Sequence, residues 1–277
     1  MLFEQAFMSL PEFLLGTPYS HYGHEGTLVT AYSMAILQEL NGRNVNNPIA
    51  CLRGEARYKI ASSRRADIHL DLESMNVLND ALTRYCIKQH NWLEAKFWRL
   101  NDAGKPTVDR VKAVLLMLKD LIRLSVFPDE PLSSDSDSIS ARYLLHGYQS
   151  DPKKLLAFKK NSKNGIPGFT RSWTSKIRIA GEQNGLKSFN LDREVTQFDG
   201  FIGAKLRELT LSLDVTNFAY VPCNPDPQDY WLYLTRLDTI GMEHDGVSFE
   251  IAGGCLTESV EGSYETIGQF VAENMAA

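Results

Sequence analysis

The stretch Trp92-Leu93-Glu94-Ala95-Lys96-Phe97-Trp98 decides the fold of this chain. It is aromatic and aliphatic, and it contains no glycine or proline, which is typical of a buried strand. Side chains alternate between the two faces of a strand, so the residues at 93, 95 and 97 are expected on one face and Glu94 and Lys96 on the other. Charged groups near a core are costly unless they are paired or hold a metal ion. The pair Glu94 and Lys96 therefore indicates a site.

A second strand is predicted upstream, in Arg64-Arg65-Ala66-Asp67-Ile68-His69-Leu70-Asp71-Leu72. Apolar residues at 68, 70 and 72 alternate with polar residues at 67, 69 and 71, the period of a half-buried strand. An acid at the start of one strand, followed by Glu-x-Lys on a later apolar strand, resembles the PD-(D/E)xK nuclease superfamily. The matching residues are Asp67, Glu94 and Lys96, and Ala66 stands where the superfamily name has proline.

This resemblance implies a metal-dependent endonuclease that hydrolyses phosphodiester bonds of DNA, with RNA left open as a substrate. Asp67, Glu94 and the backbone carbonyl of Ala95 would bind Mg²⁺ or Mn²⁺, since hard oxygen ligands suit both ions. Lys96 would orient the attacking water, help to deprotonate it, or offset negative charge. Glu25, at the start of a predicted helix, matches an acid that many members carry. The other interpretation is a first-turn glutamate that complements the helix dipole.

The predicted elements follow the superfamily's αβββαβ core order, a mixed sheet flanked by helices in the α+β or α/β class. A short helix within residues 1–20 precedes this core. The core itself comprises a helix over 27–40, a hairpin of strands 52–61 and 67–72, a central strand over 86–99, a helix over 107–126 and a strand over 141–148. Residues 73–84 are interpreted as a short helix or long turn, and Thr107 as an N-cap. Residues 1–150 would form the nuclease-like domain.

Residues 151–277 are predicted to form a basic segment and a β-rich subdomain that binds substrate or a partner. Strands are expected over 206–222, 230–240 and 247–252, with a terminal helix over 261–275. Basic charge with interleaved aromatic residues is typical of nucleic-acid contact, although a solvated basic surface has the same composition. The candidate nucleic-acid-binding residues are Lys153, Lys154, Lys159, Lys160, Lys163, Arg171, Lys176 and Arg178.

The composition of the 277-residue chain is that of an ordinary globular protein, with 43% hydrophobic residues. Its net charge of −5 gives no overall basic footprint. No apolar run is long enough to span a membrane, and no signal peptide is recognisable, so we expect a cytoplasmic protein without a membrane partner. The resemblance implies a role in bacterial restriction or anti-phage defence, as a homodimer or a subunit of a defence complex. Two alternatives remain: a catalytically silent nucleic-acid-binding or assembly module, and a structural α+β protein.

Overall fold

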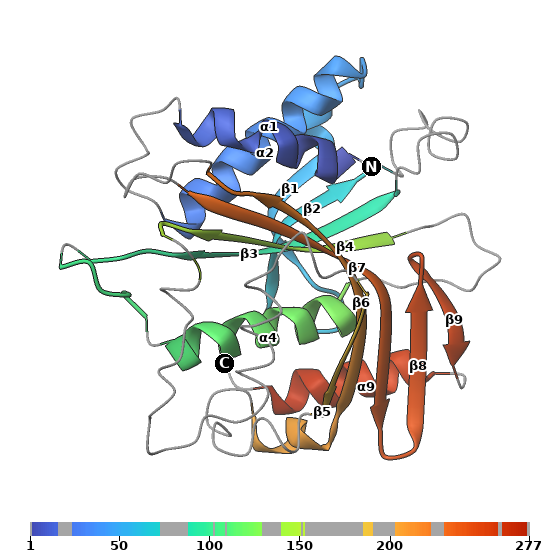
Figure 1. The fold of residues 1–277 in the computed structure, drawn as a ribbon. Coiled ribbons are helices and arrows are strands. Elements are labelled where there is room, and N and C mark those ends of the chain that lie inside the picture. The colour runs from blue at the N-terminus through green and yellow to red at the C-terminus, as the bar shows by residue number, and fades with distance from the viewer. Residues whose placement is uncertain are drawn as a thin grey trace.

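The computed structural model describes residues 2–15, 24–72, 88–101, 103–108, 110–128, 140–150, 152, 185–190, 203–222, 230–259 and 262–275. These residues form a mixed α+β structure around one twisted sheet of nine strands (Figure 1). The sheet order is β1-β2-β3-β4-β7-β6-β5, with β8 paired to β7 and β9 to β8. Among the described strands, only the pair β3–β4 is parallel. The α+β class is therefore confirmed.

The first half of the sheet is built from the four strands that the sequence predicts. They are β1 (Leu52–Arg57), β2 (Arg65–Asp71), β3 (His90–Trp98) and β4 (Ser140–Tyr148). The strands β1 and β2 form the expected antiparallel hairpin. Every residue of β4 is buried, as expected for a central strand that is covered on both faces.

Helices cover both faces of the sheet. The helices α1 (Leu2–Leu15) and α2 (Glu25–Gly42) lie on one face, and α4 (Arg110–Val126) and α9 (Ser263–Asn274) on the other (Figure 1). In α2 the predicted apolar stripe is buried, and it comprises Leu28, Tyr32, Ala35, Ile36 and Leu40. Because α4 connects β3 to β4, these two parallel strands are joined by the predicted helical crossover.

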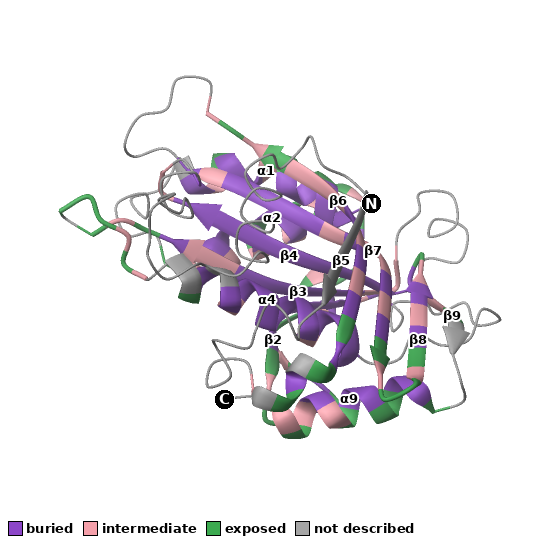
Figure 2. Cartoon of the chain, turned by 60° about the horizontal axis from the view of Figure 1, so that its bottom comes forward, coloured by how far each residue is buried: buried purple, intermediate pink, exposed green. Residues whose placement is uncertain are grey.

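The alternation predicted for the central strand is confirmed by two separate cores. Leu93, Ala95 and Phe97 pack in the core beneath α1 and α2, whereas Trp92 and Trp98 pack in the core beneath α4 and α9. Both cores lie at the buried middle strands of the sheet (Figure 2). Each face of β3 thus contributes apolar side chains to one of the two cores. This fixes the register of the strand, because a slip by one residue would exchange the two faces.

Several predicted boundaries in the first half are wrong. Strand β1 ends at Arg57 rather than at residue 61, and β3 begins at His90, after Lys88 and Gln89. Helix α4 begins at Arg110, so Thr107 is not its N-cap. Both the amide and the hydroxyl of Thr107 donate to the carbonyl of Arg99, at 3.1 Å each, which ties this residue into the preceding loop. The predicted helix or turn over 73–84 lies outside the described residues.

The second half extends the same sheet. The predicted hairpin is present as β6 (Thr210–Tyr220) and β7 (Trp231–His244), followed by β8 (Val247–Ala252) and the terminal helix α9. Two strands were not predicted, β5 (Gly185–Asn190) and β9 (Cys255–Ser259). Since β4 pairs with β7, the sheet is continuous from one half of the chain to the other. The predicted division at residue 150 falls between two strands of this sheet and stays a prediction.

Candidate active site

The site begins where β2 and β3 stop pairing. Their register ends at Ile68 opposite Leu93, although both strands continue beyond this pair. Past it, the N–H of Ala95 has no backbone acceptor on β2 and donates instead to Oδ2 of Asp67, at 2.6 Å. Asp67 therefore takes the place of a backbone rung in the sheet. The gap that opens between the two strands exposes both polar backbone groups of Ala95 to neighbouring side chains.

The ammonium group of Lys96 occupies this gap and contacts three oxygen atoms. It donates to the carbonyl of Ala95 at 2.7 Å, and it pairs with Oε1 of Glu25 at 3.3 Å and with Oδ2 of Asp120 at 3.1 Å. Glu25 is the first residue of α2, as the sequence predicts. The two helices on opposite faces of the sheet thus both send a carboxylate to the same lysine, because Lys96 lies near the end of β3.

Glu94 is held on the α4 side of the sheet. Glu94 is 1% exposed, and its Oε1 atom accepts a hydrogen bond from the Tyr58 hydroxyl at 2.6 Å. The Nε atom of Arg123 lies 3.4 Å from the same oxygen. A buried carboxylate with a cationic and a hydroxyl partner is a low-cost arrangement in a core. The structure therefore brings together Glu25, Asp67, Glu94 and Lys96, the predicted site residues.

Three residues of this cluster were missed by sequence reasoning, namely Tyr58, Asp120 and Arg123. In α4, Nη1 of Arg123 pairs with Oδ1 of Asp120 at 3.0 Å, one helical turn away. Both stand between Leu118 and Leu124, in a helix whose buried residues are mostly apolar. Two charged residues three positions apart on a buried helix face need buried partners. That pattern is the signal that would have assigned them to the site.

Burial dominates the electrostatics of the cluster. It raises the pKa of Glu25, Asp67, Glu94 and Asp120 above the usual carboxyl range, and for Glu94 the neighbouring Asp120 raises the pKa further. Burial alone would lower the pKa of Lys96, but the surrounding carboxylates, Asp120 foremost, raise it above its ordinary value. Lys96 is therefore a cation here and has no basic lone pair with which to accept a proton.

The cluster carries more negative than positive charge. Four carboxyl groups face two cations, Lys96 and Arg123, so the ionised cluster has a formal charge of minus two. Among the residues that the structure describes, no three His, Cys, Asp or Glu side chains are placed together to hold a metal ion. The donor set nevertheless fits Mg²⁺ or Mn²⁺ in kind, because carboxylate oxygens and the Ala95 carbonyl are hard ligands. The Lys96 ammonium stands among them.

The predicted nucleic-acid-binding residues between Lys153 and Arg178 lie outside the described residues. A different group of cations is present on the hairpin that carries Asp67. Arg57 and Arg65 are exposed and stand directly opposite each other on β1 and β2. Like charges in such a cross-strand pair are destabilising. An anion that binds between the two strands would remove this repulsion.

No family model, no curated protein and no solved structure matches this chain. Within the part of the chain that the structure describes, none of the helices has the length and apolar character needed to cross a membrane. The functional interpretation therefore depends on the residues of the cluster and their geometry.

The raised pKa of Glu94 predicts how stability changes with pH. The ordinary value is 4.5, and burial raises the folded-state pKa well above it. The folded protein thus binds this proton more tightly than the unfolded chain, so the contribution to stability is complete below pH 4.5 and is lost as pH rises through the folded-state pKa. In Glu94→Gln this loss is absent. The free energy of unfolding of Glu94→Gln, relative to that of wild type, should therefore increase with pH by up to about 1.4 kcal/mol per pH unit.

Urea unfolding in the presence of a chelator, at several pH values from about 4.5 upward, measures this difference. The control is Glu243→Gln, because Glu243 is exposed on β7. A difference between Glu94→Gln and wild type that is constant across this pH range would show that Glu94 does not titrate as the structure requires.

Proposed function

We propose that the protein is a metal-dependent endonuclease acting on DNA, on a restriction-endonuclease-like core. The element order α2-β1-β2-β3-α4-β4, with β3 and β4 parallel, supports this core. The observation that carries the proposal is the buried cluster of four carboxyl groups around Lys96 and Arg123, placed where β2 and β3 separate. A divalent cation would favour the ionised form of these carboxyl groups and offset their charge.

Asp67, Glu94, the Ala95 carbonyl and Glu25 would hold the ion, and Asp120 adds a fifth oxygen donor within reach of Lys96. When bound, Mg²⁺ or Mn²⁺ would supply positive charge that activates an attacking water and stabilises the pentavalent transition state. Lys96 would leave the Ala95 carbonyl and direct its ammonium to the scissile phosphate. As a cation it would offset the charge that develops there rather than act as a base.

The hairpin of β1 and β2 would contact the sugar–phosphate backbone next to the scissile bond. Arg57 and Arg65 are exposed and stand opposite each other in the hairpin. Arg65 precedes Asp67 by two residues along β2. Arginine recognises phosphate through two parallel hydrogen bonds. This surface adds to the predicted contacts of the basic segment at 153–178. A role in restriction or anti-phage defence, a cytoplasmic location, and assembly as a homodimer or within a defence complex remain part of the proposal.

The experiment is incubation of the protein with supercoiled plasmid, linear DNA and single-stranded RNA, each with Mg²⁺, Mn²⁺ or EDTA. We expect cleavage of DNA that requires metal and is lost in Glu94→Gln, while Glu243→Gln cleaves like wild type. Cleavage in EDTA, or cleavage by Glu94→Gln at the wild-type rate, would contradict the proposal. Cleavage of RNA alone would reassign the substrate and leave the site unchanged.

A catalytically silent binding or assembly module on the same fold is the second candidate. One observation favours it: Lys96 already donates to the Ala95 carbonyl, and Tyr58 and Arg123 already contact Glu94. Such a cluster is held together without any metal ion. This candidate predicts salt-dependent DNA binding in a gel shift, with no cleavage under any metal, and equal binding by wild type and Glu94→Gln.

The hairpin predicts a specific salt dependence of DNA binding. Each cation that neutralises a phosphate contributes about 0.9 to the slope of log affinity against log salt. Replacing both Arg57 and Arg65 by glutamine should therefore reduce the magnitude of this slope by about 2 and weaken binding to all sequences alike. Fluorescence anisotropy with a labelled duplex, over a range of KCl concentrations, measures the slope. The control is Lys205→Gln, an exposed cation in the short 3-10 helix Ala204–Glu208 before β6. An unchanged slope in the double variant would remove the hairpin from the DNA contact.

A further inference from the structure

A pocket of about 320 Å³ lies near the start of β3 and β4, whereas the cluster lies near the end of β3. Lys88 precedes β3 and Ser140 begins β4, whereas Lys96 is in register with His146 further along β4. His146 lies six positions after Ser140 along β4, which corresponds to about 20 Å. The volume falls at the lower end of the range for small-molecule sites. The nuclease proposal uses none of the residues that line this pocket.

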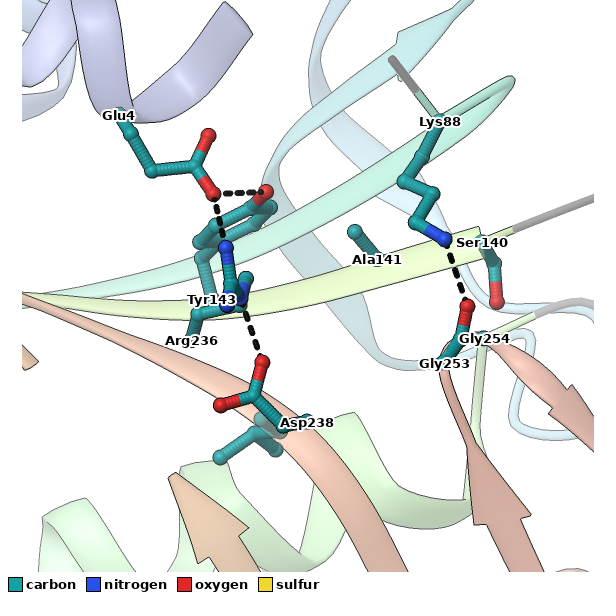
Figure 3. A pocket seen from close by; sticks show the side chains of 10 residues that line it. Glu4, Lys88, Ser140, Ala141, Tyr143, Arg236, Asp238, Gly253 and Gly254 are labelled. Carbon is teal, nitrogen blue, oxygen red and sulfur yellow. Dashed lines mark hydrogen bonds and ion pairs between the residues drawn. The ribbon is translucent and has the colours of Figure 1, made fainter. Parts of the chain in front are cut away.

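The pocket has two polar sides with an apolar floor between them. Figure 3 shows Glu4, Arg236 and Asp238 on one side, Lys88 and Ser140 on the other, and Ala141 between the two. The guanidinium of Arg236 pairs with Glu4 at 2.8 Å and with Asp238 at 2.5 Å. One cation between two carboxylates leaves this side with a net negative charge. Lys88 makes the opposite side positive.

Within the described part of the chain, each side also has a buried polar atom without a hydrogen-bond partner. Glu4 is 5% exposed, and its Oε1 accepts from both the Tyr143 hydroxyl and Arg236, but its Oε2 accepts nothing. Ser140 is 3% exposed, and its Oγ has no hydrogen-bond partner among the residues that the structure describes. Buried polar atoms in native proteins are almost always hydrogen-bonded. Glu4 Oε2 and Ser140 Oγ are two exceptions, and both belong to residues that line this pocket, on opposite sides of it.

The positive side is held in a fixed position. The Lys88 ammonium donates to the carbonyl of Gly253 at 2.7 Å, in the turn between β8 and β9. Gly253 and Gly254 both have positive φ, at 61° and 96°, a conformation that glycine adopts without strain. The turn thus brings a backbone oxygen to Lys88 and fixes the ammonium beside Ser140 (Figure 3).

We propose that this pocket binds a small zwitterion with one ammonium group and one carboxylate, such as a free amino acid. The ligand ammonium would donate to Oε2 of Glu4, because an ionised carboxylate is an acceptor only. The ligand carboxylate would accept from the Ser140 hydroxyl in the field of Lys88. The charge of the ligand is thus opposite to that of the wall at each end. Ala141 and Leu237 would contact the apolar part of the ligand.

The test is thermal unfolding of the wild-type chain with a panel of probes, each at about 10 mM. At this concentration a ligand with a millimolar Kd raises Tm. The probes are the twenty free amino acids, β-alanine and γ-aminobutyrate, so that short and longer charge separations are both covered. We expect at least one probe to raise Tm, and its decarboxylated amine and N-acetyl derivative to have no effect. If no probe raises Tm, or if the amine and the N-acetyl derivative raise it equally, the proposal is wrong.

Calorimetric titration with the best probe then assigns binding to this pocket. Glu4→Gln and Ser140→Ala should each weaken the affinity at least about tenfold, whereas Glu12→Gln, on the exposed side of α1, should bind like wild type. Ser140→Ala removes only a hydroxyl without a partner, so this variant keeps the test decisive even if Glu4→Gln does not fold. Wild-type affinity in Ser140→Ala would overturn the proposed orientation and with it the site.

Discussion

Replacing Lys96 by methionine should lower the rate of metal-dependent DNA cleavage by about 10²- to 10⁴-fold, the range typical of a group that acts directly on the reacting atoms. Methionine keeps the length and apolar stem of the side chain but removes the ammonium group. The lost charge is one that Asp120, Glu25 and the Ala95 carbonyl hold in position near the end of β3. The effect is expected in kcat, because a charge that meets developing negative charge acts in the transition state.

Single-turnover cleavage of a labelled duplex, at saturating Mg²⁺, measures this effect without interference from product release. The control is Lys205→Met, an exposed lysine away from the cluster. Asp120→Asn provides a graded comparison, because it removes a partner of Lys96 and one of five proposed oxygen donors but keeps the Lys96 ammonium. It should lower the rate less than Lys96→Met. A native circular dichroism spectrum for Lys96→Met, with wild-type cleavage, would exclude Lys96 from catalysis.

Replacing Arg123 by methionine should destabilise the protein by about 3–5 kcal/mol, the typical cost of leaving a buried charge without its partner. Arg123 contacts Glu94, Asp120 and, through Nη2, the backbone carbonyl of Arg65 at 2.7 Å. Without it, two buried carboxyl groups lose their nearest guanidinium. Protonation of these groups limits the cost, so the loss of stability should be smaller at acidic pH and larger at neutral pH.

Urea unfolding at about pH 5 and about pH 7.5 measures both the size and the pH dependence of this loss. Arg99→Met, an exposed arginine just after β3, should change stability by less than about 0.5 kcal/mol. The double variant Arg123→Met with Glu94→Gln should recover part of the loss, by about 0.5–3 kcal/mol, since residues in contact are not additive. Equal losses at both pH values would mean that Arg123 acts through packing and not through charge.

The sequence predicts the middle of the fold well because periodicity is a local property. The alternation over 92–98 assigned Leu93 and Glu94 to opposite faces, and the helical spacing in α2 placed Glu25 at a helix start. The contact between Glu25 and Lys96 depends on how α2 packs on the sheet, and it is consistent with the predicted order of the elements. Boundaries were less predictable: Thr107 is tied to Arg99 across a loop, a contact that no local pattern encodes.

The partners of the predicted residues could not be derived from spacing. Tyr58 meets Glu94 from 36 positions away, and Arg123 meets it from the helix that follows β3. Which side chain completes a buried ion pair depends on how the helix packs on the sheet, not on the strand itself. The pocket at Glu4 and Ser140 is still less predictable, because it joins α1, β4, β7 and the β8–β9 turn.

Nicking of supercoiled plasmid by wild type and Lys96→Met, side by side with Mg²⁺ and with EDTA, tests the central claim most directly. We predict that wild type nicks or linearises the plasmid only with Mg²⁺, and that Lys96→Met leaves it supercoiled under both conditions. Mg²⁺-dependent cleavage that is the same in both proteins would contradict the assigned site. The absence of cleavage by wild type with either Mg²⁺ or Mn²⁺, together with salt-dependent binding to the same plasmid, would instead establish the catalytically silent module.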